Sequence, residues 1–129
     1  MIQEIKGCYT ALITPLKDDR IDYDKLEKLI ADQIEAGVDG ILACGTTGQS
    51  ATLRVAEHCI LAKRIYNFVQ SIDPSVNVIV GAGSNSTHEA ISLSRDIERE
   101  IGPTTFLQKD LLGQRRIEDG GQIYANAAR

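Results

Sequence analysis

The run Gly45-Thr46-Thr47-Gly48 is the segment of this sequence best suited to bind a small anion. Its glycines permit unusual backbone angles and a close approach, while its threonines offer two hydroxyls and two adjacent amide N–H groups. Consecutive N–H groups in a turn can form a concave site for a carboxylate or another small oxyanion. The run is neither a GxGxxG fingerprint nor a Walker A loop, because no lysine follows the second glycine. The alternative is a plain Gly/Thr turn before a helix.

The other residue types that commonly carry chemistry form no clear constellation. His58 and His88 fall in expected helices and lack Cys, His or carboxylate partners at a metal-ligand spacing, which favours surface or packing roles and predicts no metal site. Lys109 is the lysine nearest to an expected strand end, but its place in a polar segment argues against a Schiff-base role. The run of residues 81–85 (GAGSN) has no third glycine, so it indicates a tight turn rather than a dinucleotide site.

Strands and helices alternate along residues 8–107. Short apolar runs predict strands over residues 8–14, 40–44, 76–80 and 104–107. Helical periodicity predicts helices over residues 23–36, from a cap at Thr52 to about residue 70, and over residues 87–100. Asp22 is the expected cap of the first of these helices, and Ser86 with Glu89 has the spacing of a capping box for the third.

This alternation predicts a parallel sheet covered by helices, in a doubly wound α/β fold or a (β/α)₈ barrel. A complete barrel takes about 250 residues, so this chain of 129 residues could supply only about half of one. The expected content is about three and a half βα units over residues 1–107. Residues 108–129 show neither an apolar strand nor a helical stripe. They are expected to be a disordered tail, or a segment not native to the fold that arose through frameshift, truncation or cloning.

Composition narrows the class of protein. The 43% hydrophobic and 25% charged residues are typical of a globular chain, and the net charge of -4 gives no reason to expect binding to nucleic acid or to an anionic membrane. No apolar run reaches the roughly 18 residues that a transmembrane helix needs. Three cysteines without a CxxC motif, and no signal peptide, predict reduced thiols and a cytoplasmic protein.

Three motifs together resemble the dihydrodipicolinate synthase and N-acetylneuraminate lyase family of class I aldolases. They are the loop of residues 45–53 (GTTGQSATL) after 39–41 (DGI), residues 10–15 (TALITP), and residues 81–91 (GAGSNSTHEAI). The resemblance covers roughly residues 7–107 and implies the N-terminal half of a TIM barrel. The Thr46-Thr47 pair is similar to the synthase branch, since the lyase branch more often has Ser-Thr.

The resemblance implies that Thr46 and Thr47 hold the carboxylate of pyruvate through their N–H groups. It also implies that the Thr47 hydroxyl joins a proton relay with two tyrosines. In the family reaction pyruvate forms a Schiff base with a lysine on the sixth strand, and the enamine attacks aspartate semialdehyde in lysine biosynthesis. No cofactor is implied, and the full-length enzymes are usually tetramers built from dimers.

The resemblance further implies a candidate binding site for lysine as an inhibitor at a dimer interface. The matching positions are Ser50, Ala51, His58, Asn85 and Glu89. Val55 stands where the family often has His or another polar or bulky residue, which puts feedback inhibition in doubt. Gln49 replaces the usual Glu beside the loop.

Other departures concern catalysis. The family's tyrosine pair after the fourth strand has no match, because Leu107 is followed by Gln108-Lys109-Asp110. The strand-five tyrosine, the carboxylate-binding arginine and the Schiff-base lysine also lack counterparts, so we expect this chain alone to be inactive. Two alternatives stay open: a non-catalytic, self-associating half-barrel, and a fragment of another pyruvate aldolase such as N-acetylneuraminate lyase.

Overall fold

The main sheet has four parallel strands that pair in the order in which they occur along the chain. The protein is described by a computed structural model that covers residues 5–102 and 105–107. The strands are β1 (Tyr9–Ala11), β4 (Gly40–Ala43), β5 (Asn77–Gly81) and β6 (Thr105–Leu107). They are ordered β1-β4-β5-β6, with Ile41 opposite Thr10 on one side and Val78 on the other. A doubly wound sheet reverses this order part-way, whereas a barrel does not.

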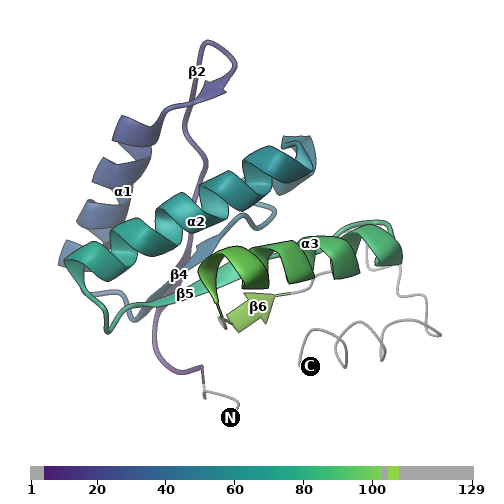
Figure 1. Ribbon diagram of the computed structural model, residues 1–129. Coiled ribbons are helices and arrows are strands. Elements are labelled where there is room, and N and C mark those ends of the chain that lie inside the picture. The colour runs from purple at the N-terminus through teal and green to yellow at the C-terminus, as the bar shows by residue number, and fades with distance from the viewer. Residues whose placement is uncertain (1–4, 103–104, 108–129) are drawn as a thin grey trace.

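Three helices cover one face of this sheet (Figure 1). They are α1 (Tyr23–Glu35), α2 (Val55–Ile72) and α3 (Thr87–Ile101), and α2 contacts both of the others. Helices on one side of a sheet with sequential strands give the winding of a barrel wall. Of the two architectures that the sequence left open, the structure therefore has the barrel type.

The hydrophobic core lies between the helices and the sheet. Strands β4 and β5 turn alternate apolar side chains toward the helices, and each helix turns one apolar stripe toward the strands. The largest fully buried side chains of this core include Ile41 and Val80 of the sheet, Leu26 and Ile30 of α1, Leu61, Ile65 and Val69 of α2, and Ile97 of α3. No helix in the described part of the chain is long and apolar enough to cross a membrane.

Local sequence explains most helix boundaries. Asp22 caps α1 by accepting a hydrogen bond from the backbone N–H of Lys25 at 3.1 Å, as predicted. Ser86 caps α3 by accepting from the N–H of Glu89 at 3.3 Å. The predicted capping box is incomplete, because the Glu89 carboxylate accepts from the Ser84 hydroxyl instead of returning to Ser86.

The expected cap at Thr52 is wrong. Residues Ser50–Thr52 form a 3₁₀ turn (η1), and the Thr52 hydroxyl donates to the Gln49 carbonyl at 2.8 Å. Helix α2 begins only at Val55, where the Glu57 carboxylate accepts from the N–H of Arg54. A threonine that bonds backward to its own turn is not free to cap a following helix.

Thr10 should weaken the fold through its hydroxyl, which is buried and has no hydrogen-bond partner in the described residues. A buried, unpaired hydroxyl costs about 1–3 kcal/mol relative to an apolar group of the same shape. We therefore expect Thr10→Val to raise the free energy of unfolding by about 1 kcal/mol in urea denaturation. Thr14→Val is the matched control and should lower it, because the Thr14 hydroxyl donates to the Gly48 carbonyl. A destabilising Thr10→Val would contradict the prediction.

Candidate functional site

The loop predicted to bind an anion begins where β4 ends. Cys44 leaves the strand with a φ of 55°, and a turn closes as the N–H of Gln49 donates to the Thr46 carbonyl at 3.0 Å. Thr46 and Thr47 are exposed at this turn. Within the described residues, their two backbone N–H groups donate to no protein acceptor. Adjacent free donors at the carboxyl end of a barrel strand are suited to an anionic ligand.

The β1 side of the loop is held by Thr14. Its hydroxyl donates to the Gly48 carbonyl at 2.7 Å, so a residue just past β1 fixes the far end of the turn. Gly48 itself lies against β1, since a Cβ there would be 3.1 Å from the Leu12 carbonyl oxygen. Thr14 is not among the site residues predicted from the sequence. The signal that could have found it is its place in the motif of residues 10–15.

The β5 side of the loop is held by a close backbone contact at Gly81. A Cβ on Gly81 would lie 2.4 Å from the Cys44 carbonyl oxygen and 3.2 Å from the Gly45 Cα. Only glycine therefore lets the end of β5 approach the start of the loop this closely. The sequence predicts a tight turn at Gly81, whereas in the structure Gly81 is the last residue of β5.

His58 of α2 contacts the same strand end. Its Nε2 atom lies 2.7 Å from the carbonyl oxygen of Gly81, and the residue is only 4% exposed. A carbonyl only accepts, so Nε2 carries the proton and donates. Burial lowers the pKa of the His58 imidazole from its ordinary value of 6.5, against an opposing effect of the Gly81 hydrogen bond. The neutral ring is thus the form that the fold favours.

This lowered pKa makes stability depend on pH. Below about pH 6.5 the unfolded chain protonates at His58 while the folded chain resists, so the unfolded state binds more protons and stability falls with falling pH. The stabilisation is fully present above pH 6.5 and is lost as the pH falls toward the lowered folded-state pKa. We expect the free energy of unfolding, measured by urea denaturation, to fall more between about pH 7.5 and about pH 5.5 for the native chain than for His58→Gln. Equal losses would contradict the prediction, and His88→Gln, which changes an exposed histidine, should behave like the native chain.

The five candidate inhibitor-site residues line one pocket of about 340 Å³ between η1, α2 and the start of α3. Among the described residues, Glu89 is the one carboxylate in its lining. Val55 stands at its rim with 42% of its surface exposed. The lining as a whole is Ser50, Ala51, Leu53, Val55, His58, Gly83, Ser84, Asn85, Ser86, Glu89 and Leu93.

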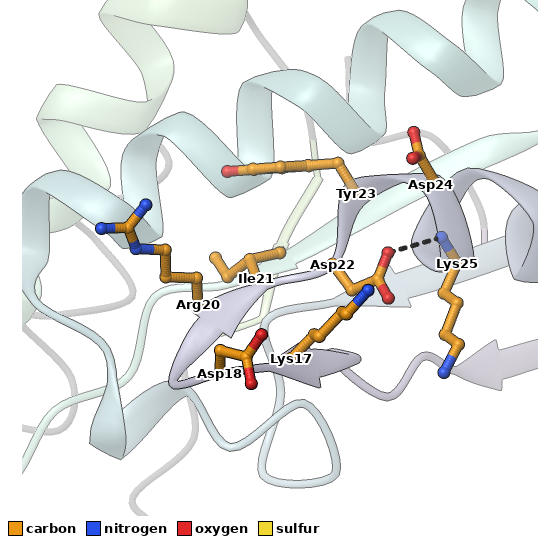
Figure 2. A pocket seen from close by; sticks show the side chains of 8 residues that line it. All are labelled: Lys17, Asp18, Arg20, Ile21, Asp22, Tyr23, Asp24 and Lys25. Atoms are coloured by element: carbon orange, nitrogen blue, oxygen red, sulfur yellow. Dashed lines mark hydrogen bonds between the residues drawn. The ribbon is translucent and has the colours of Figure 1, made fainter.

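A larger, open hollow of about 660 Å³ lies along the hairpin of β2 (Leu16–Lys17) and β3 (Arg20–Ile21) and the first turn of α1. Figure 2 shows its side chains spread along these elements, with the Asp22 carboxylate directed at the backbone N–H of Lys25. The lining carries three cationic and three acidic side chains, namely Lys17, Arg20, Lys25, Asp18, Asp22 and Asp24. Such a balance gives no preference for a ligand of either charge.

Cys44 is buried directly beside the loop and is not a nucleophile. Burial raises the pKa of its thiol to about 12, with a smaller contribution from Cys59, so the thiol stays protonated and packs as an apolar group. Among residues 5–102 and 105–107, no three His, Cys, Asp or Glu side chains gather to hold a metal ion. Within the described residues, the polar groups that the loop presents at Thr46 and Thr47 are backbone N–H donors and hydroxyls.

Comparison with known proteins places this geometry in a family. Residues 4–107 match the model of the dihydrodipicolinate synthetase family. The chain belongs to that family. A 4-hydroxy-tetrahydrodipicolinate synthase from Endomicrobium trichonymphae is 48% identical over 94 residues, which are 72% of this chain and 31% of that protein. This chain thus spans about a third of the length of such a relative.

Solved structures of the family share the fold. The dihydrodipicolinate synthase from Acinetobacter baumannii, complexed with pyruvate, has a TM-score of 0.83 at 35% identity, over 97% of this chain and 42% of that one. The enzyme from Cyanidioschyzon merolae, with lysine bound, has a TM-score of 0.77 at 37% identity, over 94% and 42%. The expected fold is confirmed: the described sheet and helices match the N-terminal part of the family's TIM barrel.

Proposed function

We propose that this chain supplies the carboxylate-binding part of a 4-hydroxy-tetrahydrodipicolinate synthase. That enzyme condenses pyruvate with aspartate semialdehyde. The observation that carries the proposal is the pair of N–H groups of Thr46 and Thr47 at the carboxyl end of β4, which have no acceptor in the part of the chain that the structure describes. The names of the similar proteins and the pyruvate complex of one family member support it.

In this proposal the loop binds and orients pyruvate. The two N–H groups would receive the carboxylate oxygens in charge-assisted hydrogen bonds, which are stronger than neutral ones. Because Thr14 and Gly81 hold the loop from both sides, little ordering would be needed when pyruvate binds. The Thr47 hydroxyl, exposed on the same turn, is the group that would pass a proton during the reaction.

Titration with pyruvate followed by ¹H–¹⁵N NMR tests the proposal. The amide signals of Thr46 and Thr47 should shift in a saturable way, while those of the exposed hairpin residues Asp18 and Asp19 stay in place. Acetone is the control ligand, because it keeps the ketone and lacks the carboxylate. Shifts that are equal for both ligands, or absent from the loop, would exclude a carboxylate site there.

We further propose that pyruvate binds the 129-residue chain without a covalent bond. A Schiff-base lysine needs a desolvated amine, and the lysines that the structure describes are all exposed: Lys6, Lys17, Lys25, Lys28 and Lys63. Lys109 lies outside the described residues, and its polar sequence context argues against this role. Borohydride treatment with pyruvate, followed by mass spectrometry, should leave the mass of the chain unchanged. A stable adduct would contradict this.

We also propose that the 340 Å³ pocket binds lysine. Glu89 offers a carboxylate to an ammonium group, and the side chains of Ser50 and Asn85 line the same pocket with hydrogen-bonding groups. The lysine-bound structure of the Cyanidioschyzon merolae enzyme supports this. Lysine should shift the amide signals of Ser50, Ala51 and Asn85, whereas norleucine, which lacks the ε-amino group, should not. Glu89→Gln should weaken the lysine effect by about tenfold.

A further inference from the structure

We propose that His58 is a positioning residue that sets the N–H groups of Thr46 and Thr47 through the carbonyl of Gly81. The proposal rests on the proposed function, because the orientation of these N–H groups matters only if the loop binds a carboxylate. His58 itself lies on α2, behind the sheet, and is not part of the loop. Its influence would pass through backbone atoms alone.

The first step is the hydrogen bond from His58 to β5. Gly81 is the last residue of the strand and is buried. The Nε2 atom of His58, 2.7 Å away, supplies a donor to the Gly81 carbonyl, and His58 is only 4% exposed. Removing this donor would leave a buried carbonyl unsatisfied, which favours a shift of the strand end toward another donor.

The second step is the contact between Gly81 and the start of the loop. Because the Cβ position of Gly81 is only 2.4 Å from the Cys44 carbonyl oxygen, no flexible side chain separates the two backbones. Densely packed interiors transmit small displacements rather than absorb them. A shift of Gly81 therefore moves Cys44 and Gly45.

The third step runs within the loop. The Gly45 carbonyl accepts from the N–H of Ser50 at 3.4 Å, and the Thr46 carbonyl accepts from the N–H of Gln49, so the turn is closed over Gly45. Its far end is fixed separately by Thr14 at Gly48. A displacement at Gly45 with Gly48 held in place must change the orientation of the peptide groups between them, including the 45–46 and 46–47 groups. Those peptide groups carry the N–H donors of Thr46 and Thr47.

Three variants of the full 129-residue chain test this. His58→Gln keeps a side-chain N–H that can reach the Gly81 carbonyl, His58→Met keeps bulk without a donor, and His88→Gln changes the exposed histidine. In His58→Met the amide signals of Thr46 and Thr47 should move without any ligand, and the affinity for pyruvate should fall by about tenfold. His58→Gln should keep both properties near the native values, within about threefold for affinity. His88→Gln should change neither.

A merely structural role would give another pattern. If the role were merely structural, His58→Met would shift core amide signals, such as those of Ile41 and Val78, as much as the loop amide signals. His58→Gln would then not keep the loop amide signals at their native positions. Either result would overturn the proposal.

A measurement on the native chain covers the case in which His58→Met does not fold. Pyruvate titration should shift the ¹⁵Nε2 signal of His58 together with the loop amides, although the ring lies behind the strand. Loop amides that shift while the ring signal stays fixed would overturn the proposal. If pyruvate moves neither, the proposed function fails, and a ligand-free comparison of the loop amides of the native chain and His58→Gln with those of a second donor-free variant, His58→Leu, still decides the positioning role.

Discussion

Gly81→Ala should destabilise the fold by about 3 kcal/mol or more. The new methyl group would lie 2.4 Å from the Cys44 carbonyl oxygen and 2.9 Å from its carbonyl carbon, both backbone atoms that cannot rotate away. Relief requires β5 to separate from the loop, which would also lengthen the hydrogen bond from His58. Urea denaturation followed by circular dichroism measures the loss.

Gly45→Ala is the matched control for this prediction. A Cβ there would meet only the Leu42 side chain at 3.4 Å, an ordinary van der Waals distance. It lies one residue from the same contact, so a general intolerance of the loop to alanine would affect both variants. We expect a change within about 1 kcal/mol for Gly45→Ala. Similar losses in the two variants would show that the backbone contact at Gly81 is not the cause.

Leu61→Ala should lower the free energy of unfolding by about 2–5 kcal/mol. Leu61 is fully buried at the middle of α2 and belongs to the core shared by the three helices and the sheet. Truncation removes the transfer energy of the side chain and leaves a cavity that rigid strands cannot close. The helix itself should form as well as before, because alanine is the best helix former. The loss should therefore come from packing and should appear in thermal and urea denaturation alike.

Ile60→Ala, one residue earlier on the same helix, provides the control. Ile60 is 60% exposed, so the same kind of truncation removes little buried surface. We expect a change within about 0.5 kcal/mol. A loss at Ile60 comparable to that at Leu61 would mean that this face of α2 is covered in solution.

The elements could be predicted from sequence because their signals are local. Asp22 before the apolar stripe of α1, and the β-branched run that became β5, each carry their information within a few residues. The choice between a barrel and a doubly wound sheet could not be made in this way. It depends on which strand each helix returns to, and no single residue encodes that.

The site was predictable in part. The glycine and threonine types at residues 45–48 predicted an anion-binding turn, and the turn lies at the carboxyl end of β4 as expected. The contacts that hold it were not predictable, since Thr14 and His58 are 34 and 23 residues from the carbonyls they bind. His58 was expected to pack or to lie on the surface, and burial alone would not have revealed its bond to Gly81. The prediction of a helix cap at Thr52 was wrong because the Thr52 hydroxyl has an acceptor in its own turn, the Gln49 carbonyl.

Gly40 has a consequence for how the strands find their alignment. Its missing side chain leaves room for the ring of Tyr9, whose hydroxyl accepts a hydrogen bond at 2.8 Å from Asn77 on the far side of β4. Residues 9, 40 and 77 stand in register, so a one-residue slip of β4 would put Ile41 or Asp39 under the ring. The bond joins residues 68 apart in the chain and can form only after all three strands have assembled. The chain has no tryptophan and four tyrosines, so the difference in tyrosine fluorescence between the native chain and Tyr9→Phe can report that late step.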